Sequence, residues 1–302
     1  MIFNSLIKEG RKLKKLFLFL ILLFSFTTIV NAKEVQAKKY NHIVSLTLGG
    51  DEMLLGLVSE NRIAGLSGKI NEDREISNIV DKARKFPKVE SNEEILMSLE
   101  PDLIIVADWV TKKNDDIGAV IGAKVYYYKT PSSYEEQKKV IRDLANLVEE
   151  KENGEKIIKN MDDRLKILQN KIAKSYKGTK PRILMYTSFG TTSGKNTTFN
   201  DMVRLINGVN VAAEAGVDRF KDISKEKIIE LNPDIIIVPI ARKYDNIDKL
   251  SKFLFEDPSF KNVKAIKNKK VYFIQYKNIT PISQYMIDGI EELAKVVYQL
   301  KE

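Results

Sequence analysis

The sequence predicts an α/β protein in which two similar lobes are joined by one long helix. Three observations lead to this prediction. A long amphipathic segment lies near the middle of the chain, a repeated pattern flanks it on both sides, and a continuous apolar strand follows a Pro-Asp pair in each copy of that pattern. A chain of 302 residues is long enough for two domains of ordinary size.

The long segment runs from Asn153 to Tyr176. Its apolar residues recur every three or four positions, the spacing of a helix with one buried face. They are Ile157, Met161, Leu165, Leu168 and Ile172. Asn153 can cap the start, and Gly178 with Pro181 ends the helix. Roughly 24 residues span about 36 Å at the helical rise, more than one small lobe needs. We therefore expect a rigid spacer; the alternative is a surface helix of one large domain.

The repeat relates residues 94–106 to residues 226–238 without gaps, at an offset of 132. Each copy predicts a short helix, a Pro-Asp break and a continuous apolar strand, the pattern of a parallel strand covered on both faces. Glu94 and Glu226 each lie seven residues before the proline. The helix dipole favours an acid at such a position, so each glutamate alone has a purely structural explanation.

Hydrophobic periodicity and turn residues place the other elements. In the first half we expect strands at 42–46, 62–66, 103–107 and 124–128, and helices that start near 51, 92 and 133. In the second half we expect strands at 182–186, 235–238 and 270–274, and helices at 199–206 and 287–300.

The amino terminus has the pattern of an export signal. A basic region precedes an apolar run from Leu16 to Val30, and Val30-Asn31-Ala32 offers a cleavage site, with a second option after Ala37. The alternative, a membrane anchor, needs about 20 apolar residues. With no cysteine to carry a lipid, we expect a soluble periplasmic protein. The expected divisions are 1–32 signal peptide, 33–151 first lobe, 152–177 helix and 178–302 second lobe.

Composition excludes several kinds of site. The first 32 residues hold five basic residues and one acid, so the formal net charge of +9 becomes +5 without them. Basic clusters interleaved with aromatics are absent from the sequence, and we expect no nucleic-acid partner. The chain has no cysteine and one histidine, His42, which excludes disulfides, thiolate metal sites and three-histidine centres. We expect no resident cofactor or metal and no catalytic residues.

Candidate ligand residues lie after the predicted strands, because ligands of open α/β sheets bind outside the carboxyl ends of strands. Thr47 and Gly49 belong to a Gly-rich turn whose backbone N–H groups begin a helix. Trp109 and Arg242 follow the two Pro-Asp strands; an arginine suits a carboxylate, phosphate or hydroxamate. Trp109 has the alternative of packing at the surface. The remaining candidates are Tyr186, Phe189, Lys195, Tyr276 and Tyr285.

The segment 190–196 superficially resembles a nucleotide-binding loop. That loop needs four residues between its glycines and a Ser or Thr after its lysine. Here three residues separate Gly190 from Gly194, and Asn196 follows Lys195. We expect an ordinary turn and no nucleotide hydrolysis.

Taken in order, six segments resemble the solute-binding proteins of ABC importers for iron-siderophore, haem and cobalamin. They are residues 42–58, 92–109, 124–141, 198–216, 224–239 and 263–274. The resemblance implies two Rossmann-like lobes joined by one backbone helix, the class III periplasmic binding protein fold. It also implies a monomer that binds its ligand between the lobes and is not an enzyme.

The resemblance further implies that Glu94 and Glu226 dock into arginine pockets of a permease dimer in the inner membrane. The ligand that it favours is an iron chelate such as a ferric siderophore; haem and cobalamin stay open. Two other readings compete. An exported two-lobed enzyme would need a catalytic motif, and the sequence has no GxGxxG after a first strand and no nucleophile elbow. A receptor that signals without transport would not need both glutamates.

Overall fold

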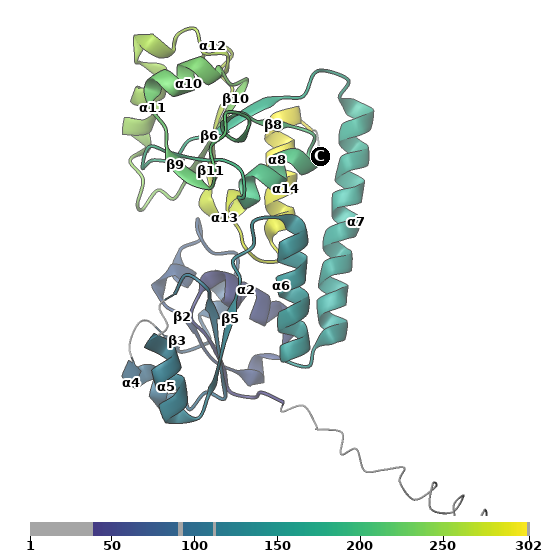
Figure 1. Ribbon diagram of the computed structural model, residues 1–302, viewed down its shortest axis with the longest axis vertical. Helices are drawn as coiled ribbons and strands as arrows, with labels where there is room; N and C mark the ends of the chain where they lie inside the picture. The colour runs from purple at the N-terminus through teal and green to yellow at the C-terminus, as the bar shows by residue number, and fades with distance from the viewer. Residues whose placement is uncertain (1–38, 90–92, 111–112, 301–302) are drawn as a thin grey trace, which may run out of the picture. The chain divides into compact units, whose positions relative to one another are not determined.

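Two parallel β-sheets carry the fold, and the computed structural model describes them within residues 39–89, 93–110 and 113–300 (Figure 1). Among these residues, the first sheet has five strands in the order β3-β2-β1-β4-β5. The strands are β1 Ile43–Ser45, β2 Ile63–Ser67, β3 Lys88–Val89, β4 Leu103–Ala107 and β5 Lys124–Tyr128. The helical segments before α6 are α2 Leu48–Leu57, η1 Glu60–Arg62, η2 Lys69–Glu72, α3 Val80–Ala83, α4 Glu93–Ser98 and α5 Lys113–Ile121.

The second sheet has the order β11-β10-β6-β8 within the described residues. Its strands are β6 Arg182–Met185, β8 Val209–Asn210, β10 Ile235–Ile240 and β11 Val271–Gln275. A separate antiparallel ribbon pairs β7 Thr191–Ser193 with β9 Phe220–Asp222. The helical segments are α8 Thr198–Leu205, α9 Val211–Glu214, α10 Lys225–Leu231, α11 Ile247–Phe255, η3 Pro258–Phe260, α12 Lys264–Lys267, α13 Tyr276–Ile279 and α14 Met286–Tyr298.

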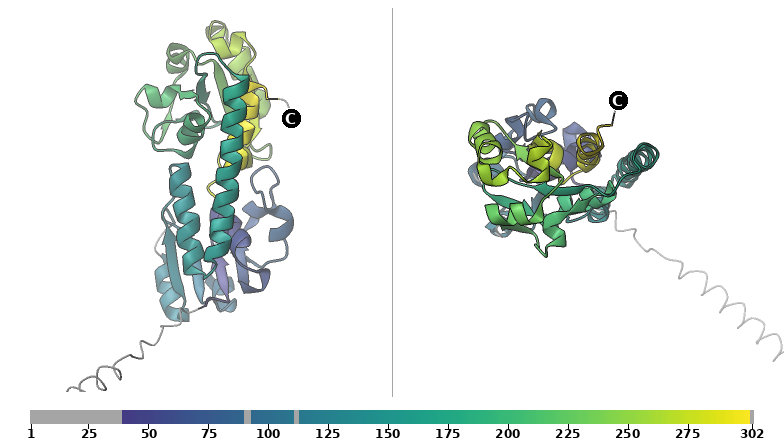
Figure 2. Two further views of the ribbon diagram at one scale, coloured as in Figure 1. Left: turned by 90° about the vertical axis from the view of Figure 1, so that its right-hand side faces the viewer. Right: turned by 90° about the horizontal axis from the view of Figure 1, so that it is seen from above.

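The two sheets are connected by α6 Tyr134–Leu147 and the long helix α7 Lys151–Ser175. One face of α7 is buried, and it packs against α6 and α2 of the first lobe and against α14 of the second (Figure 2). The buried residues are Gly154, Ile158, Met161, Leu165, Leu168 and Ile172. The predicted α/β fold of two lobes joined by one long helix is confirmed.

Each sheet turns alternate side chains to opposite faces, as the two-residue period of a strand requires. In β6, Ile183 and Met185 join the hydrophobic cluster that includes the buried face of α7, whereas Leu184 belongs to a cluster on the other face. In β4, Ile105 and Ile104 divide in the same way. The cluster on the α7 side therefore continues from one lobe into the other, while each sheet has a separate cluster on its far face.

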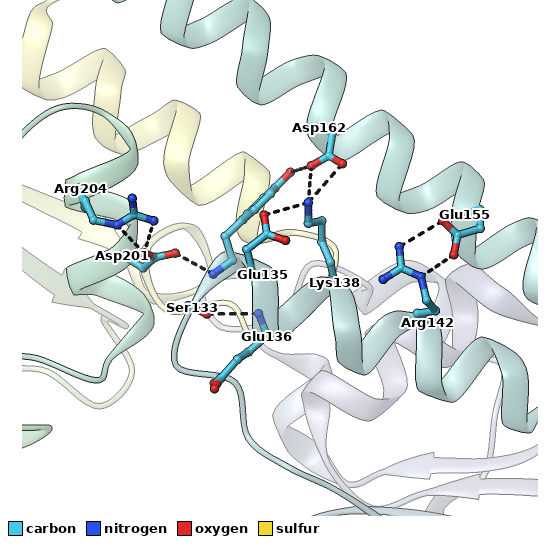
Figure 3. A network of polar contacts seen from close by, with 10 residues as sticks. Ser133, Glu135, Glu136, Lys138, Arg142, Glu155, Asp162, Asp201 and Arg204 are labelled. Atoms are coloured by element: carbon cyan, nitrogen blue, oxygen red, sulfur yellow. Dashed lines mark hydrogen bonds and ion pairs between the residues drawn. The ribbon is translucent and has the colours of Figure 1, made fainter.

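A polar network ties the start of α6 to α7 and to the second lobe (Figure 3). The Lys138 ammonium lies 2.9 Å from Asp162 of α7, and the Tyr134 hydroxyl donates to the same carboxylate at 3.1 Å. Asp201 of α8 accepts the Tyr134 backbone N–H at 2.8 Å. A carboxylate from the second lobe thus lies at the positive end of a first-lobe helix.

Several local predictions were wrong. Helix α7 begins at Lys151, so Asn153 is not its cap; the Asn153 amide donates instead to the Leu57 carbonyl at 3.0 Å. The buried stripe uses Ile158 where Ile157 was expected. The segment 190–196 was expected as a turn, but it contributes strand β7. Its partner strand β9 lies far along the chain, so no local pattern indicated this pairing.

The predicted signal peptide (1–32) and both cleavage positions fall outside the described residues. None of the helices in the described part of the chain has the length and apolar character needed to cross a bilayer. Residues Tyr40–Glu302 form one compact unit.

The close contact between α6 and α7 yields a stability prediction. A Cβ added at Gly154 would lie 2.5 Å from the Ala145 Cβ. Alanine usually stabilises a helix interior relative to glycine by about 1 kcal/mol, but overpacking a core costs about 1–3 kcal/mol. We expect Gly154→Ala to lower the free energy of unfolding by up to about 2 kcal/mol in urea denaturation. The double variant Gly154→Ala/Ala145→Gly restores the space and should recover part of the loss; a stabilised single variant would contradict this packing.

Candidate functional site

Most candidate residues follow the carboxyl ends of strands. These strands lie on either side of the point in each sheet where the strand order reverses. In the first sheet the reversal lies between β1 and β4, which are followed by Thr47 and Trp109. In the second sheet it lies between β6 and β10, which are followed by Phe189 and Arg242. Such reversal points are where open α/β sheets bind ligands.

Large aromatic side chains are exposed at these strand ends. Trp109 is 66% exposed, Phe189 84%, Tyr244 60% and Tyr276 45%. Each comes shortly after β4, β6, β10 or β11. Exposed aromatics at such positions suit a flat or apolar ligand. A hollow of about 470 Å³, open to solvent, is lined by residues 242–248 at the end of β10.

The Gly-rich helix start near Thr47 is already occupied by protein groups. The Thr47 hydroxyl lies 2.9 Å from the Tyr128 hydroxyl, and the Gly50 N–H also bonds to that oxygen. Burial raises the pKa of Tyr128. A Cβ at Gly49 would lie 2.9 Å from the Ile282 carbonyl oxygen. Thr47 and Gly49 therefore contact the chain itself, and an anion has no open approach to this helix end.

Residues 280–285 cross from the second lobe onto α2. The Ser283 hydroxyl donates to Glu52 at 2.5 Å, and the Gln284 amide donates to the Glu52 carbonyl at 2.5 Å. Burial is the main cause of the raised pKa of Glu52. Tyr285 is partly buried against the shared core, and burial also raises its pKa, followed by the nearby Glu52 and Asp288. Tyr285 thus lies at this crossing.

Arg242 forms a second contact between the two lobes. Its backbone N–H donates to Glu75 of the first lobe at 2.5 Å, and its Nη1 lies 3.2 Å from the same carboxylate. The neighbouring Lys277 N–H donates to the Glu75 carbonyl at 3.0 Å. Segment 73–78 therefore reaches the strand ends of the second sheet.

Two candidates lie elsewhere. Tyr186 is buried in the core of the second lobe, where its ring stacks on Phe253 at 5.6 Å between centroids, so it is not placed as an exposed wall. Lys195 is exposed on a bridge to Asp218, beside the β7–β9 ribbon.

Glu94 and Glu226 occupy equivalent positions. Each is exposed and is the second residue of its helix, α4 or α10. Figure 1 shows both helices on the side of their lobes away from α7. Hydrogen bonds from its own backbone and from Ser224 lower the pKa of Glu226.

A buried polar cluster supports segment 73–78. The Asp51 carboxylate accepts hydrogen bonds from Ser67 and, at 2.5 Å, from the Asn71 amide. Asn71 in turn accepts from the Ser77 hydroxyl at 3.3 Å. Complete burial raises the Asp51 pKa to about 7 against the hydrogen bonds that lower it. Across the described ranges, no group of three His, Cys, Asp or Glu residues is placed to hold a metal ion.

Comparison with known proteins identifies the family. The family described as periplasmic binding protein matches residues 43–277. The chain belongs to the periplasmic binding protein family. This periplasmic binding protein is 24% identical over 267 residues to the uncharacterized ABC transporter substrate-binding lipoprotein YvrC of Bacillus subtilis, a match that covers 86% of the chain and 81% of YvrC.

Two further relatives carry ligand names. The molybdate-binding protein MolA of Haemophilus influenzae is 24% identical over 229 residues, which covers 68% of this chain and 64% of MolA. The crystal structure of a possible iron-binding (periplasmic solute-binding) protein of Staphylococcus epidermidis has a TM-score of 0.71 at 23% identity and covers 86% of this chain and 100% of that one. This structural likeness concerns the fold.

Sequence reasoning missed four residues that the structure places near the candidate site. Glu75 lies among polar residues that give no periodic signal, whereas Glu52 lies in a helix whose start was predicted. Their partners are 167 and 231 residues away, so no local pattern indicates either contact. Tyr128 ends a predicted strand, but its contact with Thr47 depends on how two strands pair. Tyr244, by contrast, could have been found, because it follows the same Pro-Asp strand as Arg242.

The Asp51 environment predicts a pH dependence. An acid whose folded pKa of about 7 exceeds its ordinary 3.8 keeps its proton in the folded state while the unfolded state ionises. The contribution to stability is therefore fully present below pH 3.8 and is lost as pH rises toward about 7. We expect the stability of Asp51→Asn relative to the parent to increase from pH 4 to pH 7, by at most about 4 kcal/mol, and then to level off.

Urea denaturation at five pH values between 4 and 8.5 measures this difference. All other carboxylates are common to both proteins and cancel. A stability difference that does not change with pH would show that Asp51 is ionised in the folded protein throughout this range.

Proposed function

We propose that the chain is the substrate-binding component of an ABC importer, exported to the periplasm by the signal peptide 1–32. Membership of the periplasmic binding protein family over residues 43–277 carries this proposal. The two-lobed fold supports it, and so does the name of the relative YvrC. We divide the exported chain into a lobe at 33–151, the connecting helix at 152–177 and a lobe at 178–302.

The ligand binds, in this proposal, at the interlobe site, which we define as the loops that follow β1, β4, β6, β10 and β11. The exposed Trp109, Phe189 and Tyr276 supply apolar contact, and Arg242 supplies a cation. Thr47, Gly49, Tyr186 and Tyr285 support the site from within, and Lys195 lies at its periphery.

An iron chelate such as a ferric siderophore fits these residues, because chelates combine apolar surface with anionic oxygens that an arginine can bind. Haem and cobalamin are the alternatives. Exposed Tyr244 and Tyr276 favour haem, since a phenol oxygen is a known haem-iron ligand. The name of MolA adds an oxyanion, molybdate, to the compounds worth testing.

Delivery requires a permease. We propose that Glu94 and Glu226 dock onto a permease dimer in the inner membrane, one from each lobe. Their equivalent, exposed places on α4 and α10 support this role. Charge complementarity of this kind fixes orientation and accelerates encounter. The protein acts as a monomer without a resident cofactor.

Ligand binding is testable through Trp109, the single tryptophan of the sequence. Because its side chain is 66% exposed at the end of β4, a ligand at the interlobe site should change its fluorescence. We expect ferric enterobactin or ferrichrome to quench it and to stabilise the protein by about 2.7 kcal/mol at 100 times the Kd. Haemin, cyanocobalamin and molybdate complete the panel.

Thermal denaturation of the parent protein with each ligand separates binding from optical absorption by the ligand, because it does not depend on Trp109 fluorescence. Stabilisation by haemin or cyanocobalamin alone would select that alternative. If no member of the panel alters either signal, the proposed ligand class is wrong.

Permease docking is testable by removing both carboxylates. We expect Glu94→Ala/Glu226→Ala to reduce uptake of the bound ligand into cells at least tenfold while leaving its affinity unchanged. The variant Glu60→Ala/Glu256→Ala removes the same charge from exposed positions, one in each lobe and neither on α4 or α10, and should transport normally. Full uptake by the first variant would remove the docking role.

A further inference from the structure

Segment 73–78 belongs to the first lobe by sequence but contacts the second lobe through the carboxylate and the backbone carbonyl of Glu75. It follows β2 and η2, and in its middle Glu75 meets Arg242 and Lys277. Arg242 follows β10. Lys277 is the second residue of α13, two residues after β11 ends at Gln275. Glu75 is therefore a carboxylate of one lobe placed at the ligand-facing edge of the other sheet.

The Glu75 carboxylate is held in place. Its side chain is only 17% exposed, and its backbone N–H donates to Asp73 at 2.8 Å. Behind it, the Asp51, Asn71 and Ser77 hydrogen bonds fix the same segment. An immobilised acceptor pays little entropy when it binds a cation, unlike a mobile surface glutamate.

The Arg242 guanidinium is held much less completely. It is 72% exposed, and Glu75 binds it through Nη1 while the second carboxylate oxygen is taken by the Arg242 backbone N–H. A guanidinium has five donors and binds a carboxylate best through two of them. An incoming oxyanion can offer that two-point contact, so the pair in this structure can be exchanged.

We propose that Glu75 is a specificity-determining residue of the interlobe site. Glu75 pairs with Arg242, and it yields that arginine to a ligand that brings a carboxylate, catecholate or inorganic oxyanion of its own. A ligand without such a group gains nothing from the exchange and meets Arg242 already neutralised. Glu75 thus competes with the anionic group of a ligand for Arg242, so it lowers the affinity for anionic ligands and leaves the affinity for uncharged ligands of similar size unchanged. This inference rests on the proposed function, specifically on Arg242 as a ligand-binding residue.

Matched ligand pairs test this competition. Haemin and haemin dimethyl ester differ in two carboxylates, and ferric enterobactin and ferrichrome are an anionic and an uncharged ferric siderophore. Calorimetry with Glu75→Gln should show three- to tenfold tighter binding of the charged member of whichever pair binds, and a change of less than twofold for the uncharged member. Arg242→Gln should weaken the charged member and abolish the effect of Glu75→Gln in the double variant.

Glu60→Gln is the control variant, because Glu60 pairs with Lys85 at 3.0 Å within the first lobe and should leave all affinities unchanged. Equal changes for both members of a pair in Glu75→Gln would make Glu75 a structural bridge and overturn the proposal. No change in either member would overturn it as well.

Hydrogen exchange tests the contact without ligand. The Arg242 amide bonds to Glu75, whereas the Tyr244 and Asp245 amides bond to the Ala241 carbonyl at 2.8 and 2.9 Å. In Glu75→Ala the Arg242 amide should exchange at least tenfold faster while the other two keep their rates. Unchanged exchange at Arg242 would overturn the proposal whatever the ligand.

If neither ligand pair binds any variant, the proposed ligand class is wrong, and molybdate then decides the role of Glu75. Tighter molybdate binding by Glu75→Gln than by the parent, lost again in the double variant with Arg242→Gln, supports the exchange. The same molybdate affinity in parent and Glu75→Gln overturns it.

Discussion

The packing of one face of α7 against both lobes is the constraint on which the rest of the structure depends. Six buried positions along this helix contact α2 and α6 at one end and α14 at the other. A packed apolar interface resists shear and rotation. The packing of α7 therefore holds the two sheets so that segment 73–78 of the first lobe contacts the carboxyl ends of strands in the second. The far side of the helix is solvated, with Ile167 68% exposed, so α7 lies along the lobes and not inside a single core.

Polar contacts refine what this packing begins. Asp201 on the Tyr134 N–H, Ser283 on Glu52 and Glu75 on Arg242 each join the lobes at a different point. Two of these contacts are largely buried, where an unmade hydrogen bond is costly. The third, at Arg242, involves an exposed guanidinium and is the weakest. Breaking the two buried contacts, at Tyr134 and at Glu52, therefore costs more than breaking the exposed contact at Arg242.

The fold was predictable because its signals are local. The Pro-Asp break and continuous apolar run of 103–107 give β4 with the bounds that the structure shows, and β5 at 124–128 likewise. Even the burial of Tyr186 had a signal, since it alternates with Leu184 on one face of a strand.

The site was less predictable because its contacts join distant residues. The sequence placed Trp109, Phe189 and Arg242 after the right strands, yet it gave no indication that Glu75 covers Arg242 or that Tyr128 fills the helix start beside Thr47. Such contacts depend on strand pairing and on the path of irregular segments, neither of which has a period.

The shared hydrophobic cluster also has a consequence for how the protein is made. Its members extend from Tyr40 to Val297, and those of α14 close it against α7. A chain emerging from the ribosome cannot complete this core until α14 has been synthesised. Until then the apolar residues of the first lobe and of α7 lack their partners from α14, and chaperones can bind them.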